Sequence, residues 1–188
     1  MKKVFLNIFG DLIAKIYISI IKKSIDNYYT KTQLNSAQIG IKTFLYGRGT
    51  ILFSENIKIG DYCRIGENYF FHGMGGIKIG DNTILSRNVT IYSANHNYLS
   101  NNQIPYDDSY ISKQVIIGNS VWIGMNVCIL PGVEISDGAI IGMGAIISKN
   151  VGIGEIVVGS SQRVVGSRDI NNFENLKTNK QYHGKFNN

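Results

Sequence analysis

The sequence predicts a parallel β-solenoid, and three observations carry this prediction. The first is a strict period of six between residues 117 and 158, where each unit opens with Ile and carries Val or Ala four residues later. A helix repeats every 3.6 residues and a strand every second residue, so neither places a large and a small apolar side chain at these offsets over this length. Three such hexads make one triangular coil of about 18 residues, with each Ile pointing into an axial core.

The second observation is a corner motif that occurs at residues 57–61, 77–81 and 115–119. Each copy ends with Ile, Gly and then Asp or Asn, and the first two copies lie 20 residues apart. A coil in this region is therefore three hexads plus a closing dipeptide. The side chains expected to point inward in this register are Ile39, Leu45, Ile51, Ile59, Ile65, Phe71, Ile79, Leu85 and Ile91.

The third observation is the glycine content, 21 of 188 residues, which suits a fold whose tight corners need positive φ. A chain of this length can bury on the order of 70% of its unfolded surface, which is enough for a single soluble domain. The two cysteines, Cys63 and Cys128, lack metal-ligand spacing. Cys63 falls at the small inward position of its hexad, which predicts a buried thiol.

The repeat is interrupted after residue 96. Residues 97–114 are polar and aromatic without periodicity, and the hexads resume at Val115. Such a segment is predicted to leave the solenoid as a loop. Because His96 stands at the root of this loop, it is the first candidate for a site residue.

The net charge and the N-terminal segment indicate which classes of partner the protein could bind. The formal charge of +6 comes from dispersed Lys and Arg residues, which argues against nucleic acid and suits a small anionic cofactor. Residues 2–23 predict an amphipathic helix with a wide apolar face, in which Asp11 and Lys15 argue against a signal peptide and a membrane span. Two roles stay open for it: packing on the solenoid end or on a neighbouring subunit, and peripheral membrane contact through residues 1–23.

At this point the chain resembles the hexapeptide-repeat acyltransferases, in the branch that includes galactoside, maltose and nodulation-factor O-acetyltransferases. The resemblance rests on three ordered segments, IGDNTILSRNVTIYSANH (79–96), VIIGNSVWIGMNVCILPGVEISDGAIIGMGAIISKNV (115–151) and VVGSSQRVVGSR (157–168). It implies a left-handed parallel β-helix, a homotrimer and acetyl-CoA as the acyl donor. The period of six predicts the triangular prism, whereas the left hand comes only from the resemblance.

The expected organisation is an all-β protein in three parts. Residues 1–36 form the N-terminal helical segment, and residues 37–166 form the left-handed parallel β-helix with one extruded loop. Residues 167–188, rich in Asn and Lys, are expected to be a frayed polar tail.

His96 matches the catalytic histidine of this family. An alcohol needs a base to attack a thioester near neutral pH, and a neutral imidazole is the side chain best suited to take its proton. His72 has no family counterpart and His183 lies in the tail, so both are expected to be incidental. Only two histidines fall within the solenoid, which argues against the three-His zinc site of other proteins with this fold, and no metal is expected.

The resemblance implies further site residues. Asn68 matches an asparagine that hydrogen-bonds the acceptor sugar, although an Asn at a corner also tolerates positive φ. Trp122 matches a tryptophan that lines the donor and acceptor pocket, and it would otherwise be an exposed apolar side chain. The positions expected to contact acetyl-CoA are Gly124, Gly142 and Gly144 along the pantetheine arm, and Lys149, Arg163 and Arg168 near the phosphates.

The expected activity is acetyl-CoA-dependent O-acetylation of a sugar hydroxyl, with His96 as general base in a ternary complex. The N-terminal cap of the maltose and galactoside enzymes is not recognisable here, which favours a cell-surface polysaccharide or its precursor as acceptor and a cytoplasmic enzyme. N-acetylation of an amino-sugar nucleotide or an antibiotic-type acceptor is the alternative, because the same fold serves both. A purely scaffolding solenoid is disfavoured because His96, the loop and Trp122 occur together in the expected order.

Overall fold

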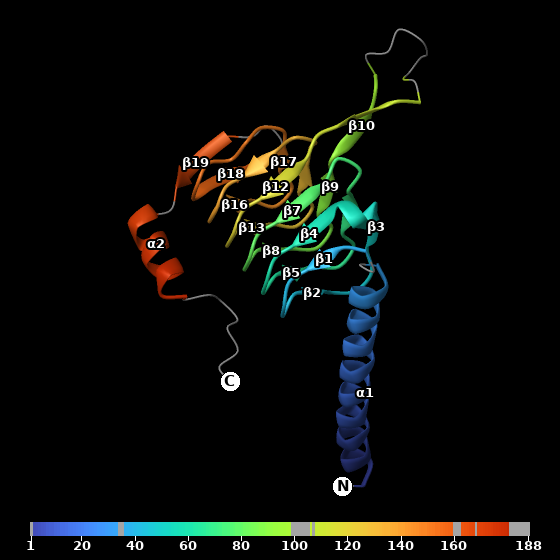
Figure 1. The fold of residues 1–188 in the computed structure, drawn as a ribbon. Helices are drawn as coiled ribbons and strands as arrows, with labels where there is room; N and C mark the ends of the chain where they lie inside the picture. Colours follow the sequence, from blue (N-terminus) through green and yellow to red (C-terminus); the bar gives the residue numbers. More distant parts are fainter. Residues whose placement is uncertain are drawn as a thin grey trace.

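The computed structural model describes residues 2–33, 36–98, 106, 108–159, 163–167 and 169–180, and its central part is a triangular prism of short strands (Figure 1). Three sheets form the three faces, with one strand per coil on each face. The prism is a left-handed β-helix of about six turns, which confirms the predicted fold class.

The faces are named here by their strands. Face A consists of β1 (Gln38–Ile39), β4 (Ile57–Ile59), β7 (Ile77–Ile79), β12 (Val115–Ile117) and β15 (Glu134–Ile135). Face B consists of β2 (Phe44–Leu45), β5 (Arg64–Ile65), β8 (Ile84–Leu85), β13 (Trp122–Ile123), β16 (Ile140–Ile141) and β18 (Glu155–Val158), with β19 (Arg163–Ser167) antiparallel at its edge. Face C consists of β3 (Thr50–Leu52), β6 (Phe70–His72), β9 (Thr90–Tyr92), β14 (Cys128–Ile129) and β17 (Ile146–Ile147), and a short 3-10 helix, η1 (Ser54–Asn56), follows β3.

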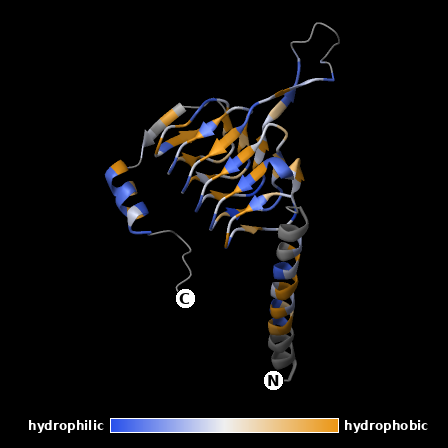
Figure 2. Cartoon of the chain, in the orientation of Figure 1, coloured by the Kyte–Doolittle hydropathy of each residue, from blue (hydrophilic) through white to orange (hydrophobic). Residues whose placement is uncertain are grey.

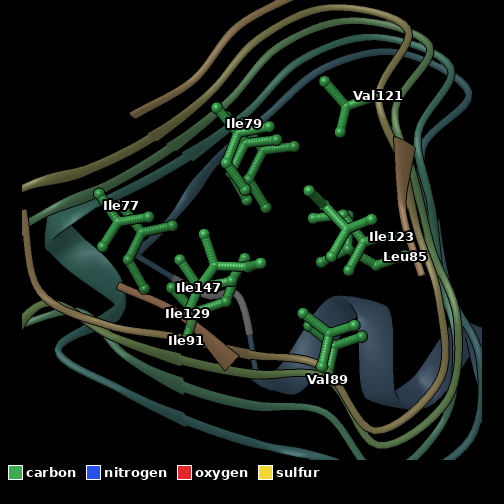
Figure 3. Close-up of a cluster of buried hydrophobic side chains, with 14 of the residues drawn as sticks. Ile77, Ile79, Leu85, Val89, Ile91, Val121, Ile123, Ile129 and Ile147 are labelled. Atoms are coloured by element: carbon green, nitrogen blue, oxygen red, sulfur yellow. The ribbon is translucent and has the colours of Figure 1, made fainter. Parts of the chain in front are cut away.

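The core is one column of apolar side chains along the prism axis (Figure 3). The predicted inward side chains are fully buried, except Ile39 and Ile51, which are half-buried. Both belong to the first coil, which has a neighbouring coil on one side only. The Cys63 thiol is buried as predicted and donates to the carbonyl oxygen of Gly80 (3.0 Å). Burial raises its pKa to about 11, so the thiol stays protonated near neutral pH.

Tyr69 departs from the hexad pattern, because it is a large side chain at a position where other coils carry Val or Ala. Its ring is buried, and a Cβ on Gly49, one coil away, would collide with that ring. The absence of a side chain at Gly49 therefore provides the volume that Tyr69 fills. The two residues stand 20 residues apart at the same position of successive coils, so the register of the repeat pairs them, and the sequence analysis missed this exchange of volume.

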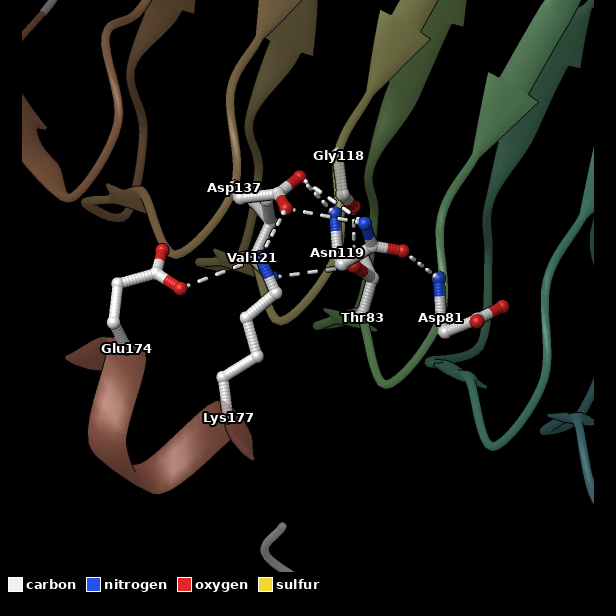
Figure 4. Close-up of polar contacts among 8 residues, drawn as sticks. All are labelled: Asp81, Thr83, Gly118, Asn119, Val121, Asp137, Glu174 and Lys177. Atoms are coloured by element: carbon white, nitrogen blue, oxygen red, sulfur yellow. Dashed lines mark hydrogen bonds and ion pairs between the residues drawn. The ribbon is translucent and has the colours of Figure 1, made fainter. Parts of the chain in front are cut away.

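A row of hydrogen bonds links successive A–B corners, where the chain passes from face A to face B. The carboxylate of Asp61 accepts from the backbone N–H of Ile41, and that of Asp81 accepts from the N–H of Asp61. The row continues in the next two coils, where Asn119 accepts from the N–H of Asp81 and Asp137 accepts from the N–H of Asn119 (Figure 4). Each of these bonds is 2.8 Å long, so the corners keep one geometry along the prism.

The prediction of a frayed tail is wrong for the part that the structure describes, because residues 170–178 form helix α2 (Ile170–Thr178). The carboxylate of Asp169 caps the helix by accepting from the backbone N–H of Asn172 (3.1 Å). Phe173 is buried against the corner at Gly138. Ile170, Phe173 and Leu176 recur at helical spacing and were the signal that the sequence analysis missed, although Phe173 is the only one of the three that is buried.

Lys177 of α2 completes the docking by pairing with Asp137 at 3.4 Å (Figure 4). This contact joins the helix to the end of the corner row. Glu174 lies 3.8 Å from the same ammonium group but is more exposed.

Helix α1 (Lys2–Gln33) extends from the first coil away from the prism (Figure 1). Figure 2 shows apolar residues over much of its described middle part, and Leu12, Ile16, Tyr17 and Ile20 are more than half exposed. The predicted helix is confirmed, but these side chains do not pack on their own solenoid. No helix in the described part of the chain is both long and apolar enough to cross a membrane.

The link between Asp137 and α2 generates a pH-dependent prediction. Burial acts to raise the pKa of Asp137, but hydrogen bonds from the backbone and side chain of Asn119 and from Lys177 outweigh it, so the pKa is lowered. A folded pKa below the unfolded value of 3.8 means that the stabilisation is complete above that value and is lost as pH falls through the folded pKa. We expect Asp137→Asn to lower the free energy of unfolding by about 1 kcal/mol at pH 7, which corresponds to a decrease in Tm of about 2–4 °C.

The difference between the two proteins should shrink as pH falls through the folded pKa of Asp137, because the native carboxyl then becomes neutral. Thermal unfolding of both proteins from pH 7 downward measures the difference. Glu174→Gln is the matched control, because its exposed ion pair should contribute little at any pH. An Asp137→Asn deficit that does not shrink with falling pH would contradict the assignment.

Candidate active site

His96 lies where the chain leaves the prism between face C and face A. Strand β10 (Ala94–His96) pairs with β11 (Tyr110–Ser112) as an antiparallel ribbon that projects from the prism (Figure 1). The register places His96 opposite Tyr110. The predicted exit of residues 97–114 is confirmed, but their return is an ordered strand rather than an irregular loop. Residues 99–105 and 107 lie outside the described residues.

The root of the ribbon is anchored by Ser93, which is fully buried. Its hydroxyl donates to the carbonyl oxygen of His72 (2.6 Å) and accepts from the backbone N–H of Gly75 (2.9 Å). Its carbonyl oxygen accepts from the N–H of Lys113 (2.8 Å), where the ribbon returns to the prism. A Cβ at Gly75 would collide with this carbonyl, so only glycine fits there. The ribbon is therefore attached to the preceding coil at a fixed point.

The imidazole of His96 is half-buried and contacts two tyrosine rings of the extruded segment. Tyr106 stacks on it with a centroid distance of 3.9 Å and an interplanar angle of 15°, and Tyr110 lies at 4.7 Å and 35°. The Nδ1 atom is buried and has no hydrogen-bond partner among the described residues. Ring contacts, rather than a hydrogen bond to Nδ1, hold the plane of the imidazole. The aromatic composition of residues 97–114 was visible in the sequence, but without periodicity the pairing of Tyr110 with His96 was not.

The two predicted acceptor residues lie on other parts of the prism. Trp122 projects from face B between Ile84 and Ile140 and is 52% exposed. Asn68 occupies the B–C corner with φ 59°, and its N–H donates to the carbonyl oxygen of Arg48. That left-handed conformation is one that Asn tolerates, so the corner explains this residue without a ligand. One chain does not bring either residue into a pocket with His96.

The glycines predicted for the cofactor lie together at the B–C corner of later coils. A Cβ on Gly124 would lie 2.7 Å from the backbone nitrogen of Met143, and one on Gly142 would lie 2.7 Å from Val158. Close stacking of the coils therefore requires these two glycines. Gly144 has φ 74° and open space beside it.

The predicted basic residues are more widely placed. Lys149 is exposed and follows β17 at the C–A corner. Arg163 begins β19 at the edge of face B, and its side chain is outside the described part of the structure. Arg168 also lies outside the described residues.

Both halves of the prism match known repeat families. Residues 114–149 match the family described as bacterial transferase hexapeptide (six repeats), and residues 56–93 match the hexapeptide repeat of succinyl-transferase. The two matches lie on either side of the ribbon that carries His96.

A curated relative and two solved structures extend these matches to sugar acetyltransferases. WbbJ of Escherichia coli (strain K12), whose name provisionally assigns it to lipopolysaccharide biosynthesis as an O-acetyl transferase, is 30% identical over 92 residues. A maltose O-acetyltransferase from Clostridium difficile 630 is 29% identical with a TM-score of 0.58, over 70% of this chain and 67% of that one. A galactoside acetyltransferase solved in complex with coenzyme A is 27% identical with a TM-score of 0.64, over 72% and 67%.

The chain therefore contains the bacterial transferase hexapeptide repeats and shares the fold of these sugar acetyltransferases. This confirms the resemblance that the sequence motifs indicated. The WbbJ match covers 45% of this chain and 44% of that protein, so the chain spans less than half the length of this curated relative.

The sequence analysis missed one feature of this chain, an aromatic cluster at the foot of the ribbon. The ring of His72 stacks on Tyr92 (5.2 Å, 8°) and meets Phe53 edge-on (5.3 Å, 64°). Its Nδ1 atom is buried without a hydrogen-bond partner among the described residues. The coil register places Leu52, His72 and Tyr92 in one outward column, and this register was the signal that could have revealed the cluster.

Metal binding has no visible site in the part of the chain that the structure describes. No group of three or more His, Cys, Asp or Glu side chains there could hold a metal ion.

Proposed function

We propose that this protein is an acetyl-CoA-dependent O-acetyltransferase that acts on a sugar hydroxyl, in a cell-surface polysaccharide or its precursor. The observation that carries the proposal is His96, a half-buried imidazole held by ring contacts at the root of the ribbon. The relatives support the substrate class, because their names specify O-acetyl transfer in lipopolysaccharide biosynthesis and acetyl transfer to maltose and galactoside.

In this mechanism His96 acts as general base on the acceptor. As the sugar oxygen attacks the carbonyl carbon of the thioester, the imidazole takes the hydroxyl proton. The tetrahedral intermediate then collapses, the C–S bond breaks, and the coenzyme A thiolate receives the proton from the imidazolium. Both substrates are bound together and no acyl-enzyme forms.

The donor is proposed to lie along the B–C corner of the later coils. Gly144 leaves open space there, and Gly124 and Gly142 let the coils stack closely beneath it. Backbone N–H groups beside such a groove can polarise the thioester carbonyl. Lys149, Arg163 and Arg168 are proposed to contact the phosphates, and the bound coenzyme A of the galactoside acetyltransferase supports this donor class.

We further propose a homotrimer, because the site residues of one chain lie on different parts of the prism. His96 leaves the C–A corner, whereas Trp122 lies on face B. On face B, Trp122 stands between the half-buried Ile84 and Ile140, and Phe44 (41% exposed) lies further along the same column, beyond Arg64. The later coils of this face therefore present an apolar surface to a neighbouring copy. A ring of three copies would place His96 of one subunit against face B of the next.

The first functional prediction concerns His96. We expect His96→Ala to lower turnover by roughly 10² to 10⁴ and to leave acetyl-CoA affinity within a few-fold, because a general base acts on the acceptor. Release of coenzyme A over a panel of sugars, amino sugars and polysaccharides measures this. Alkali-labile product indicates an ester, whereas alkali-stable product would indicate the amide of the N-acetyl alternative. His183→Ala is the control, and an unchanged His96→Ala rate would remove the mechanism.

The second prediction tests the shared site by complementation. His96→Ala and Trp122→Ala are each expected to be nearly inactive, but co-expressed copies should recover about a quarter of wild-type activity. In a random trimer, that fraction of sites draws an intact His96 from one copy and an intact Trp122 from the next. Two differently tagged His96→Ala copies are the control. A co-expressed mixture as inactive as this control would place the site within one chain.

The third prediction concerns α1, for which we propose contact with an anionic membrane surface. The exposed apolar side chains would enter the interface, and the lysines would attract acidic lipids at about 1 kcal/mol each. We expect Lys15→Glu, Lys22→Glu and Lys23→Glu together to weaken binding to anionic vesicles at least tenfold, measured by co-sedimentation. Acetylation of a short soluble acceptor should be unchanged. If the wild-type protein does not co-sediment with anionic vesicles at low salt, the membrane role is wrong and packing between subunits is the remaining role for the helix.

A further inference from the structure

The environment of His96 differs from the usual environment of a histidine base. Such a residue commonly donates one ring N–H to a carboxylate or carbonyl, which orients the ring and stabilises the imidazolium that forms during reaction. Here Nδ1 is buried and has no partner among the described residues. The protonated ring carries N–H groups on both nitrogens, so the imidazolium that forms during reaction has an N–H at Nδ1 with no acceptor among the described residues. Any stabilisation of the imidazolium on this side must therefore come from the groups that contact the ring.

The two phenol rings are placed to provide that stabilisation. Their centroids lie 3.9 Å (Tyr106) and 4.7 Å (Tyr110) from the imidazole centroid, and the Tyr106 ring is within 15° of parallel. A cation within about 6 Å of an aromatic centroid is attracted to the negative π face. The attraction exists only for the protonated ring, so it acts on the charged state that forms as the sugar oxygen attacks.

Among the described residues, no charged side chain is recorded in contact with the imidazole of His96. Asp108, on the segment that leads into β11, is exposed, and the flanking Asn95 and Asn97 are uncharged. Lys113 lies three residues beyond Tyr110 at the root of the ribbon. Among the described residues, the titratable side chains in ring contact with the imidazole are therefore the two phenols.

We propose that Tyr106 and Tyr110 are positioning residues that stabilise the imidazolium form of His96 through their π faces, in place of a hydrogen-bond acceptor at Nδ1. This inference rests on the proposed role of His96 as general base. The register of the ribbon fixes Tyr110 opposite His96, so the pairing of β10 with β11 sets this contact. Tyr106 covers the ring and is itself 43% exposed, so it lies at the solvent side of the arrangement.

The test replaces each ring with a side chain that keeps the apolar cover but has no π face. Tyr106→Leu and Tyr110→Leu are compared with Tyr106→Phe and Tyr110→Phe, which keep the face and lose the hydroxyl. Tyr98→Leu is the matched control, because Tyr98 is 62% exposed on the same segment two residues after His96. The titration of His96 is followed directly in the free enzyme by NMR of its ring carbon-bound protons.

We expect each Leu variant to lower the titration midpoint of His96 by about 0.5 pH unit and to reduce kcat about three- to fivefold. The KM for acetyl-CoA should be unchanged, because neither ring is proposed to contact the donor. The Phe variants and Tyr98→Leu should keep the wild-type midpoint. The loss of kcat should follow the shift of the midpoint across the series.

Two results would overturn the inference: a midpoint that stays or rises in both Leu variants, or Phe variants that behave like the Leu variants. The second result would assign the effect to the hydroxyl groups. If the wild-type enzyme acetylates no sugar, the proposed function fails, but the NMR titration still decides whether the rings stabilise the imidazolium. The two failures are therefore distinguishable.

Discussion

The stacking of each coil on the next is the interaction on which the rest of this structure depends. The backbone N–H of Gly60 donates to the carbonyl oxygen of Ile79, and that of Gly80 donates to Ile117, at 2.8 Å in both cases. The second pair is separated in sequence by the whole ribbon, yet its geometry is the same. Each coil buries its apolar side chains only against its neighbours, so a lost register would expose the core. The residues inserted into the third coil must therefore leave the prism, as the ribbon does.

This constraint also determines where a site can form. The interior of the prism is filled by the Ile column. Function must then lie on the outer faces, at the corners or on an insertion. His96 lies where the rigid prism ends and the ribbon begins, and Ser93 fixes that point by binding both the preceding coil and the returning chain. A scaffold of this kind can hold a reactive side chain on a projecting segment.

The outer faces differ in polarity, because each strand presents one outward-pointing side chain and these side chains differ between the faces. Most outward residues of face A are polar, namely Gln38, Lys58, Lys78 and Glu134, with Ile116 between the last two. Most outward residues of face B are apolar, namely Phe44, Ile84, Trp122 and Ile140, with Arg64 between the first two. Outward positions do not affect the core, so each face is free to serve a separate purpose. The polar face suits solvent, and the apolar face suits contact with another copy in the proposed trimer.

The sequence by itself determined the prism, its inward residues and the point where the ribbon leaves, because a period of six repeats one local solution to burial many times. It also identified His96, through its place at the end of the last regular hexad before the interruption. Only the tertiary structure decided the partners of His96, since the ribbon has no repeat from which the pairing with Tyr110 could be deduced. The docking site of α2 was also decided only by the tertiary structure. The contact of Phe173 with the Gly138 corner is a single contact between segments distant in sequence, and no repeat in either segment specifies the other as its partner.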